Sequence, residues 1–336
     1  MEEKKRRPWR RWLVLALMIA GFVIGGVLIP VQPVISVKAE SLLGEGAPWL
    51  HLPIVGELPL VNTLPTLLVT VLLIVGLAFA TNRSMRQSER TDLVPRGVGN
   101  LMEAFFELIY NLTEGSAGAR WAPVIFPWFA TIMFYVLFAN LLKLIPGFES
   151  IGVIQHAHGE GHAIAALGGN WFNVLPAEGE YMLVAFLRGI SVDLNFTVAL
   201  ALISVVMIQV VGFRAQGFGY LSKFFNFRTM FKMPFFGAMD FLVGLLELIS
   251  ELSKILSFAF RLFGNMFAGI VLVAIVAGLL GKISILPAMV MMFELFVGLI
   301  QAFVFGMLTM VFMAQATQGH GHDEPQAEAH ADVREI

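Results

Sequence analysis

Long apolar stretches constrain this sequence more than any other feature. A helix that crosses a bilayer needs about 20 mostly apolar residues to span the ~30 Å hydrocarbon layer. With a mean hydropathy of +0.79 and only 14% charged residues, the chain cannot be a water-soluble globule. We therefore expect an all-α integral membrane protein with about six transmembrane helices. The six stretches cover residues 12–34, 60–80, 123–145, 194–213, 240–280 and 286–316.

The distribution of Lys and Arg predicts the orientation. These residues gather before the first stretch and after the second and fourth, so both termini should be cytoplasmic. We interpret residues 1–11 as a basic cytoplasmic N-terminus and 317–336 as a polar cytoplasmic tail. Residues 12–34 then form an extra N-terminal anchor, in preference to a cleaved signal peptide. Residues 100–115 are predicted to be an amphipathic helix along the membrane surface, and 147–188 a long outer loop.

Composition also excludes several classes of function. A formal charge of -2 provides no basic field for nucleic acid, and zero cysteines exclude disulfides and thiolate metal sites. All the histidines lie outside the apolar stretches, which excludes bis-histidine haem ligation within the bilayer. His156, His158 and His162 could hold a metal in the outer loop, but a solvated loop is preferred. We expect no cofactor and no metal.

Arg261 is the least expected residue, because it lies about halfway along the fifth stretch. A charge inside a bilayer is costly, and arginine keeps its proton under almost any condition. It therefore predicts a fixed electrostatic element rather than a proton carrier. Glu247, Glu251 and Asn265 share its helical face, since the stripe recurs at steps of three or four through Lys254 and Phe258.

The sixth stretch carries Glu294 and Gln301 on one face. With ~1.5 Å of rise per residue, Glu294 lies about 10 Å outward of Gln301, and Glu251 and Glu247 roughly 15 and 21 Å inward of Arg261. This spacing favours two half-channels separated by a positive barrier. A carboxylate on a partner protein could carry the proton between them, ionised opposite the arginine and neutral in lipid.

Structural interpretations of the same residues stay open. Gln301 could be an ordinary hydrogen-bonding residue between helices, and Glu247 and Glu251 could simply be solvated near the cytoplasmic end. We expect the Lys254 side chain to extend to the membrane–water interface or to pair with a glutamate, rather than to carry protons.

With these residues identified, the sequence resembles the a subunit of the membrane sector of rotary ATP synthases. The most specific segment is LSKILSFAFRLFGNMFAG at 252–269. Further matching segments are IVAGLL at 275–280, LIQAFVF at 299–305, SVDLNFT at 191–197 and NLLKLIP at 140–146. Together they indicate a domain of this kind over residues 60–316.

The resemblance implies a proton-channel subunit without a catalytic site of its own. Its partners would be the c-ring, the b subunit of the stator and the rest of the F-type ATP synthase. A bacterial inner membrane is preferred to an organelle membrane, because the basic N-terminus lacks the character of a transit peptide. The last two helices would form a long tilted hairpin against the c-ring. Arg261 would face the c-ring carboxylate, with these residues on the proton path: Glu294, Gln301, Asn265, Asp193, Asn195, Glu247 and Glu251.

Two positions depart from the family pattern. Ile270 stands where many relatives have an ionisable group, and Lys143 stands where some carry an acid, which argues against an outer-path role for that position. The sequence leaves open an ion-coupled secondary transporter, although we find no internal repeat. The choice between protons and sodium ions also stays open, and Glu294 favours protons.

Overall fold

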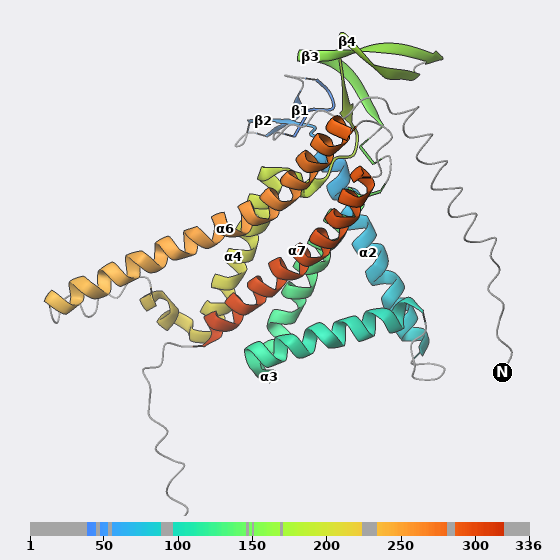
Figure 1. The fold of residues 1–336 in the computed structure, drawn as a ribbon. Helices are drawn as coiled ribbons and strands as arrows, with labels where there is room; N and C mark the ends of the chain where they lie inside the picture. Colours follow the sequence, from blue (N-terminus) through green and yellow to red (C-terminus); the bar gives the residue numbers. More distant parts are fainter. Residues whose placement is uncertain are drawn as a thin grey trace, which may run out of the picture. The chain divides into compact units, whose positions relative to one another are not determined.

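The structure is a computed structural model that describes residues 39–44, 48–52, 56–88, 97–145, 148–149, 151–168, 171–223, 234–280 and 286–318. Helices dominate this part of the chain (Figure 1). They are α2 (Thr63–Ser88), α3 (Val98–Leu142), α4 (Leu194–Gln216), α6 (Pro234–Leu280) and α7 (Leu286–Thr317), with the 3-10 turns η1 (Ile190–Val192) and η2 (Gly217–Lys223). The predicted all-α membrane protein is confirmed as mostly helical in this part of the chain, which also contains four strands.

Five of the described helices are long and apolar enough to cross a membrane. These spans are Thr63–Ser88, Val98–Leu142, Leu194–Tyr220, Leu242–Leu279 and Leu286–Thr317. They correspond to the second to sixth predicted stretches. The first predicted stretch, 12–34, lies outside the described residues, as do the basic segment 1–11 and all but the first two residues of the tail 317–336.

Helix α2 separates an apolar face from a hydroxyl face. Leu68, Leu72 and Phe79 are exposed, as expected for a helix that faces lipid rather than water. Thr66 and Thr70 are buried, and the Thr70 hydroxyl donates to the carbonyl of Thr66 at 2.8 Å, which satisfies a polar group inside an apolar helix.

Helix α3 contains both the predicted surface helix 100–115 and the predicted stretch 123–145. The two parts meet at Gly118, whose φ of 75° and ψ of 160° are not helical. Glycine reaches this conformation without a steric penalty, so the chain can change direction there (Figure 1). Leu101 and Leu108 in the first part are exposed, as the amphipathic prediction requires.

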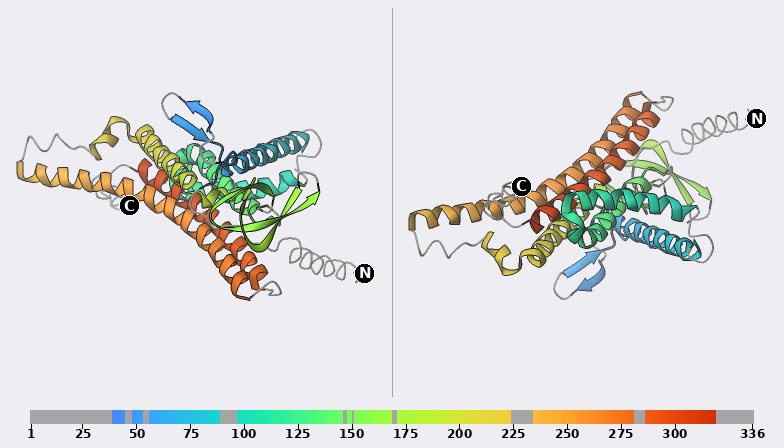
Figure 2. Two further views of the ribbon diagram at one scale, coloured as in Figure 1. Left: turned by 90° about the horizontal axis from the view of Figure 1, so that it is seen from above. Right: turned by 90° about the horizontal axis from the view of Figure 1, so that it is seen from below.

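The predicted loop 147–188 is corrected, because most of it forms an antiparallel ribbon. Strand β3 (Gly152–Gly168) pairs with β4 (Trp171–Ala185), from Gly152 opposite Ala185 to Gly168 opposite Trp171. The pairing satisfies backbone groups that a loop would leave to water, and it buries Val184. A second ribbon, β1 (Pro48–Leu52) with β2 (Gly56–Pro59), is separate from the first (Figure 2).

The chain divides into two units by its internal contacts. The first unit comprises Met1–Phe79, Phe134–Thr197 and Phe260–Phe303, and the second comprises Ala80–Met133, Val198–Ala259 and Val304–Ile336. Helices α6 and α7 pack against each other in antiparallel order within each unit. In the first unit Asn265 contacts Gln301, and in the second the rings of Phe258 and Phe305 lie 5.1 Å apart.

Candidate functional site

A buried ion pair in the first unit joins the residue that follows α3 to the third turn of α7. Lys143 Nζ donates to Glu294 Oε1 at 2.6 Å, and the two side chains are only 4% and 7% exposed. A single buried charge would be strongly destabilising, so each side chain supplies the charge that the other requires. The sequence analysis identified Glu294 as a proton-path residue but did not predict that Lys143 is its partner.

Small residues make room for this pair. A Cβ atom at Gly269 of α6 would lie 2.8 Å from Cδ of Glu294, which is closer than packed atoms approach.

On α7, the carbonyl of Gly298 accepts a hydrogen bond from Asn140 Nδ2 at 3.2 Å. The Ser191 hydroxyl donates to Asn140 Oδ1 at 2.7 Å, so polar contacts connect α3, α7 and η1.

Asp193 begins α4 as its N-cap residue. Its Oδ1 accepts from the backbone N–H of Asn195 at 2.9 Å, and its Oδ2 accepts from the Thr63 hydroxyl of α2 at 3.1 Å. The side chain is buried, whereas Asn195 is exposed. The structure therefore places Asp193 in a capping role that the sequence analysis did not predict, within the same unit as Glu294.

Asn265 and Gln301 join α6 to α7. Asn265 Nδ2 donates to Gln301 Oε1 at 2.7 Å, which places a polar contact between two apolar helices. Gln301 is buried, and among the described atoms its Nε2 has no hydrogen-bond acceptor. Arg261 is half-buried one turn before Asn265 on α6, so the predicted arginine and these two amides belong to one unit.

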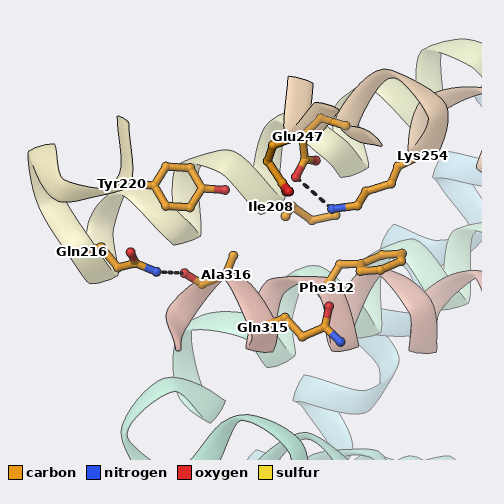
Figure 3. A pocket seen from close by; sticks show the side chains of 9 residues that line it. Ile208, Gln216, Tyr220, Glu247, Lys254, Phe312, Gln315 and Ala316 are labelled. Carbon is orange, nitrogen blue, oxygen red and sulfur yellow. Dashed lines mark hydrogen bonds and ion pairs between the residues drawn. The ribbon is translucent and has the colours of Figure 1, made fainter. Parts of the chain in front are cut away.

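A polar pocket of about 190 Å³ lies in the second unit (Figure 3). Glu251 is buried in its wall, and Lys254 Nζ donates to Glu251 Oε1 at 2.8 Å, which is one of the two alternatives expected for Lys254. Glu247 is half-buried and also lines the pocket. The lining comes from α4, η2, α6 and α7: Ile208, Gln216, Tyr220, Glu247, Glu251, Lys254, Phe312, Gln315 and Ala316.

Two polar residues of this pocket region were missed by the sequence analysis. Gln209 Nε2 donates to Glu251 Oε2 at 2.8 Å, and the Tyr220 hydroxyl donates to Gln209 Oε1 at 2.7 Å. Gln209 could have been noticed as a polar residue in an apolar stretch. No comparable signal identifies Tyr220, because its role depends on how the chain turns after α4.

The predicted site residues therefore fall into two groups, each within one unit. Arg261, Asn265, Gln301, Glu294, Asp193 and Asn195 lie in the first unit, and Glu247 and Glu251 lie in the second. Long apolar helices that carry buried ionisable and amide side chains are typical of membrane proteins that move ions. The fold and the site thus define a multi-pass membrane protein of this class.

The comparison with known families is more specific. Residues 64–314 match the family described as ATP synthase A chain. The chain belongs to this family, whose members form the proton channel in the membrane sector of ATP synthase. This agrees with the resemblance that the segment around Arg261 indicates.

Three proteins named ATP synthase subunit a illustrate the similarity. The Moorella thermoacetica protein is 27% identical over 270 residues, which are 79% of this chain and 94% of that protein. The Mycobacterium bovis protein is 29% identical over 249 residues, 74% of this chain and 83% of that protein. The Campylobacter jejuni protein (strain 81-176) is 31% identical over 244 residues, 70% and 85% of the two chains.

Proposed function

We propose that the chain forms two offset half-channels that pass protons to and from a carboxylate on a rotating c-ring during ATP synthesis. Arg261 is the fixed positive barrier between them. Membership of the ATP synthase A chain family supports this proposal. The observation that carries it is the Arg261 segment, in which Asn265 is hydrogen-bonded to Gln301 of the neighbouring helix.

The barrier role of Arg261 follows from its chemistry. A guanidinium group is a permanent cation in proteins, so it repels a proton that moves directly from one half-channel to the other. A c-ring carboxylate gives up its proton when it comes opposite this charge and takes up a proton before it returns to lipid. The bond between Asn265 and Gln301 keeps a polar face beside the arginine.

Glu294, Asp193 and Asn195 belong to the outer half-channel in this proposal. Glu294 is the ionisable group nearest the barrier along α7, and Lys143 holds its carboxylate at 2.6 Å. Asn195 is exposed at the start of α4, and Asp193 accepts hydrogen bonds beside it.

Glu247 and Glu251 belong to the cytoplasmic half-channel. Both line the pocket of the second unit, and a pocket of about 190 Å³ has room for water molecules that conduct protons. The net charge of Glu247, Glu251 and Lys254 is negative, which attracts cations to the pocket.

The partners and the hairpin rest on the family, whereas the inner membrane, the extra anchor and the cytoplasmic segments rest on the sequence pattern alone. The c-ring and the b subunit of the stator are the direct partners, within an F-type ATP synthase of a cell inner membrane. The chain supplies no catalytic site of its own. Residues 60–316 form the family domain, 12–34 an extra anchor, and the segments 1–11 and 317–336 lie in the cytoplasm. Helices α6 and α7 form the tilted hairpin against the c-ring.

The experiment that tests this function is ATP-driven proton pumping in vesicles that carry the Arg261→Ala complex. We expect pumping to be lost and passive proton leak to rise, because the barrier between the half-channels is gone. Arg86→Ala is the matched control. Arg86 is exposed near the end of α2, and its Nε donates a hydrogen bond to Asn82, one turn earlier on the same helix. Normal pumping by an assembled Arg261→Ala complex would refute the proposal.

A further inference from the structure

The described residues between 39 and 62 form a hairpin that leads into α2, here called the α2 hairpin. The ribbon of β1 and β2 is its main part. Beyond the ribbon, the Leu42 N–H donates to the Leu60 carbonyl at 2.8 Å. The Asn62 N–H donates to the Glu40 carbonyl at 3.0 Å. The pairing therefore reaches the residue that precedes α2, so the hairpin is directly joined to the helix.

Further hydrogen bonds fix this joint within the first unit. Thr63, the first residue of α2, donates to Asp193 Oδ2 at 3.1 Å. Gln155 Nε2 of β3 donates to the carbonyl of Ser41 at 2.9 Å and to that of Leu42 at 3.3 Å. Because the hairpin is bonded at its junction with α2, the depth of α2 in the bilayer also sets the depth at which the hairpin begins.

The side chains that the α2 hairpin exposes are apolar. Among its residues whose burial is described, the exposed ones are Leu43, Trp49, Leu50 and Pro59, and Trp49 is 57% exposed. Trp49 is the extra residue of a bulge, because the register advances by two residues in β1 and by one in β2. Exposed Leu64 continues this apolar surface onto the first turn of α2, a helix that faces lipid. Such a surface marks a contact with a membrane or a protein rather than with water.

The α2 hairpin lies within reach of the interfacial layer of the bilayer. Leu50 pairs with Leu58, which is five residues before α2, and five residues of strand span about 17 Å. The headgroup layer adds about 5–8 Å on each side of the hydrocarbon core. A hairpin that projected along the axis of α2 would therefore carry Trp49 and Leu50 into water. A hairpin that lies along the membrane surface keeps both side chains in the headgroup layer, which is favoured because it removes apolar area from water.

The composition of the hairpin indicates the kind of contact. Tryptophan is enriched at membrane–water interfaces, because its ring is apolar and its N–H can bond water or headgroups. Residues 39–62 contain no Lys or Arg, so attraction to anionic lipids is not the source of the contact. We propose that the α2 hairpin lies in the headgroup layer and anchors the start of α2 there through Leu43, Trp49 and Leu50. This lipid contact is independent of the half-channels proposed above.

Fluorescence quenching measures the depth of the hairpin. Because the chain has no cysteine, Leu43→Cys and Leu50→Cys each place a single thiol on it for a bimane label. The assembled complex is reconstituted in phosphatidylcholine vesicles, and the parent complex gives the background. The label is quenched in turn by a lipid with a nitroxide near the headgroup, by a lipid with a nitroxide at mid-chain, and by iodide in water. We expect the headgroup nitroxide to quench both labels most strongly.

Two control labels calibrate the three quenchers. Leu72→Cys is exposed and lies nine residues into α2, about 14 Å along the helix, so the mid-chain nitroxide should quench it most. Glu178→Cys is exposed on β4, so iodide should quench it most. If iodide is the strongest quencher of the labels on Leu43→Cys and Leu50→Cys, the hairpin projects into water. If all three quenchers fail, a protein covers it, such as a second copy of this chain. Either result would overturn the inference.

The anchoring role is tested by combining Trp49→Ser and Leu50→Ser with the label on Leu43→Cys. Iodide quenching of that label should rise and headgroup quenching should fall, because serine gains little from the headgroup layer, whereas Trp49→Phe should keep the parent pattern. Phe172→Ser is the matched control, since it also removes an exposed aromatic side chain, but from β4 and outside the hairpin. Co-purification measures assembly, and the labels on the otherwise unchanged hairpin still decide its depth if the serine variant does not assemble. Unchanged quenching in an assembled serine variant would refute the anchor.

Discussion

Replacing Lys143 with methionine tests the buried ion pair of the first unit. The substitution keeps an unbranched side chain and removes the charge that faces Glu294 at 2.6 Å. Because the side chains are 4% and 7% exposed, water cannot replace the lost partner without opening the helix contacts. The carboxylate is then left as a buried group whose charge is uncompensated.

The expected loss of folding stability is large. Removing one partner of a buried pair costs about 3–5 kcal/mol, which is at least about a hundredfold in the unfolding equilibrium. Glu294→Gln should destabilise by a similar amount, since it leaves the ammonium alone. The double variant removes both charges, so it should be more stable than the sum of the single losses by about 2 kcal/mol or more.

The assay is thermal denaturation of the detergent-purified complex, followed by loss of the chain from the assembly. Lys254→Met is the matched control. Lys254 is 19% exposed, and Glu251, although only 8% exposed, would still accept a hydrogen bond from Gln209 Nε2, so the loss of stability should be smaller than for Lys143→Met. A Lys143→Met complex as stable as the parent, or single losses that simply add in the double variant, would refute this account of the pair.

Two other regions give predictions. Gly269→Leu should overfill the space against Glu294, which lowers the free energy of unfolding by about 1–3 kcal/mol in the same melting assay and abolishes pumping. The control is Gly278→Ala, which should assemble normally because an added Cβ there meets open space. Asp193→Ala should lose the α4 cap, which lowers the free energy of unfolding by about 1–2 kcal/mol and therefore the melting temperature. Asp193→Asn should keep the cap. If Asp193 is on the proton path, Asp193→Asn should melt normally but pump less, and normal pumping would limit this residue to capping.

The membrane helices were predictable because their signal is local. The stretch 194–213 became α4, Leu194–Gln216, and the stretch 286–316 became α7, Leu286–Thr317, since length and apolarity alone specify such helices in lipid. The stripe of Arg261 and Asn265 was also predictable, because residues four apart share one helical face.

The missed features depend on long-range contacts. The ion pair of Lys143 and Glu294 spans 151 residues of sequence, and no local pattern reveals which carboxylate a buried lysine meets. The β3–β4 ribbon was predicted as a loop because its Gly-rich and His-containing composition resembles loops, although its strands pair over most of their length. Tyr220 needed the left-handed turn at Gly217 before it could reach Gln209.

In the proposed function, two half-channels open to opposite sides of the membrane. Because the chain has no cysteine, single Asn195→Cys and Glu247→Cys variants carry unique thiols. They can be labelled with a membrane-impermeant cationic thiol reagent in right-side-out and inverted vesicles. We expect Asn195→Cys to be labelled from the outer side only and Glu247→Cys from the cytoplasmic side only. Labelling of both thiols from the same side would contradict it.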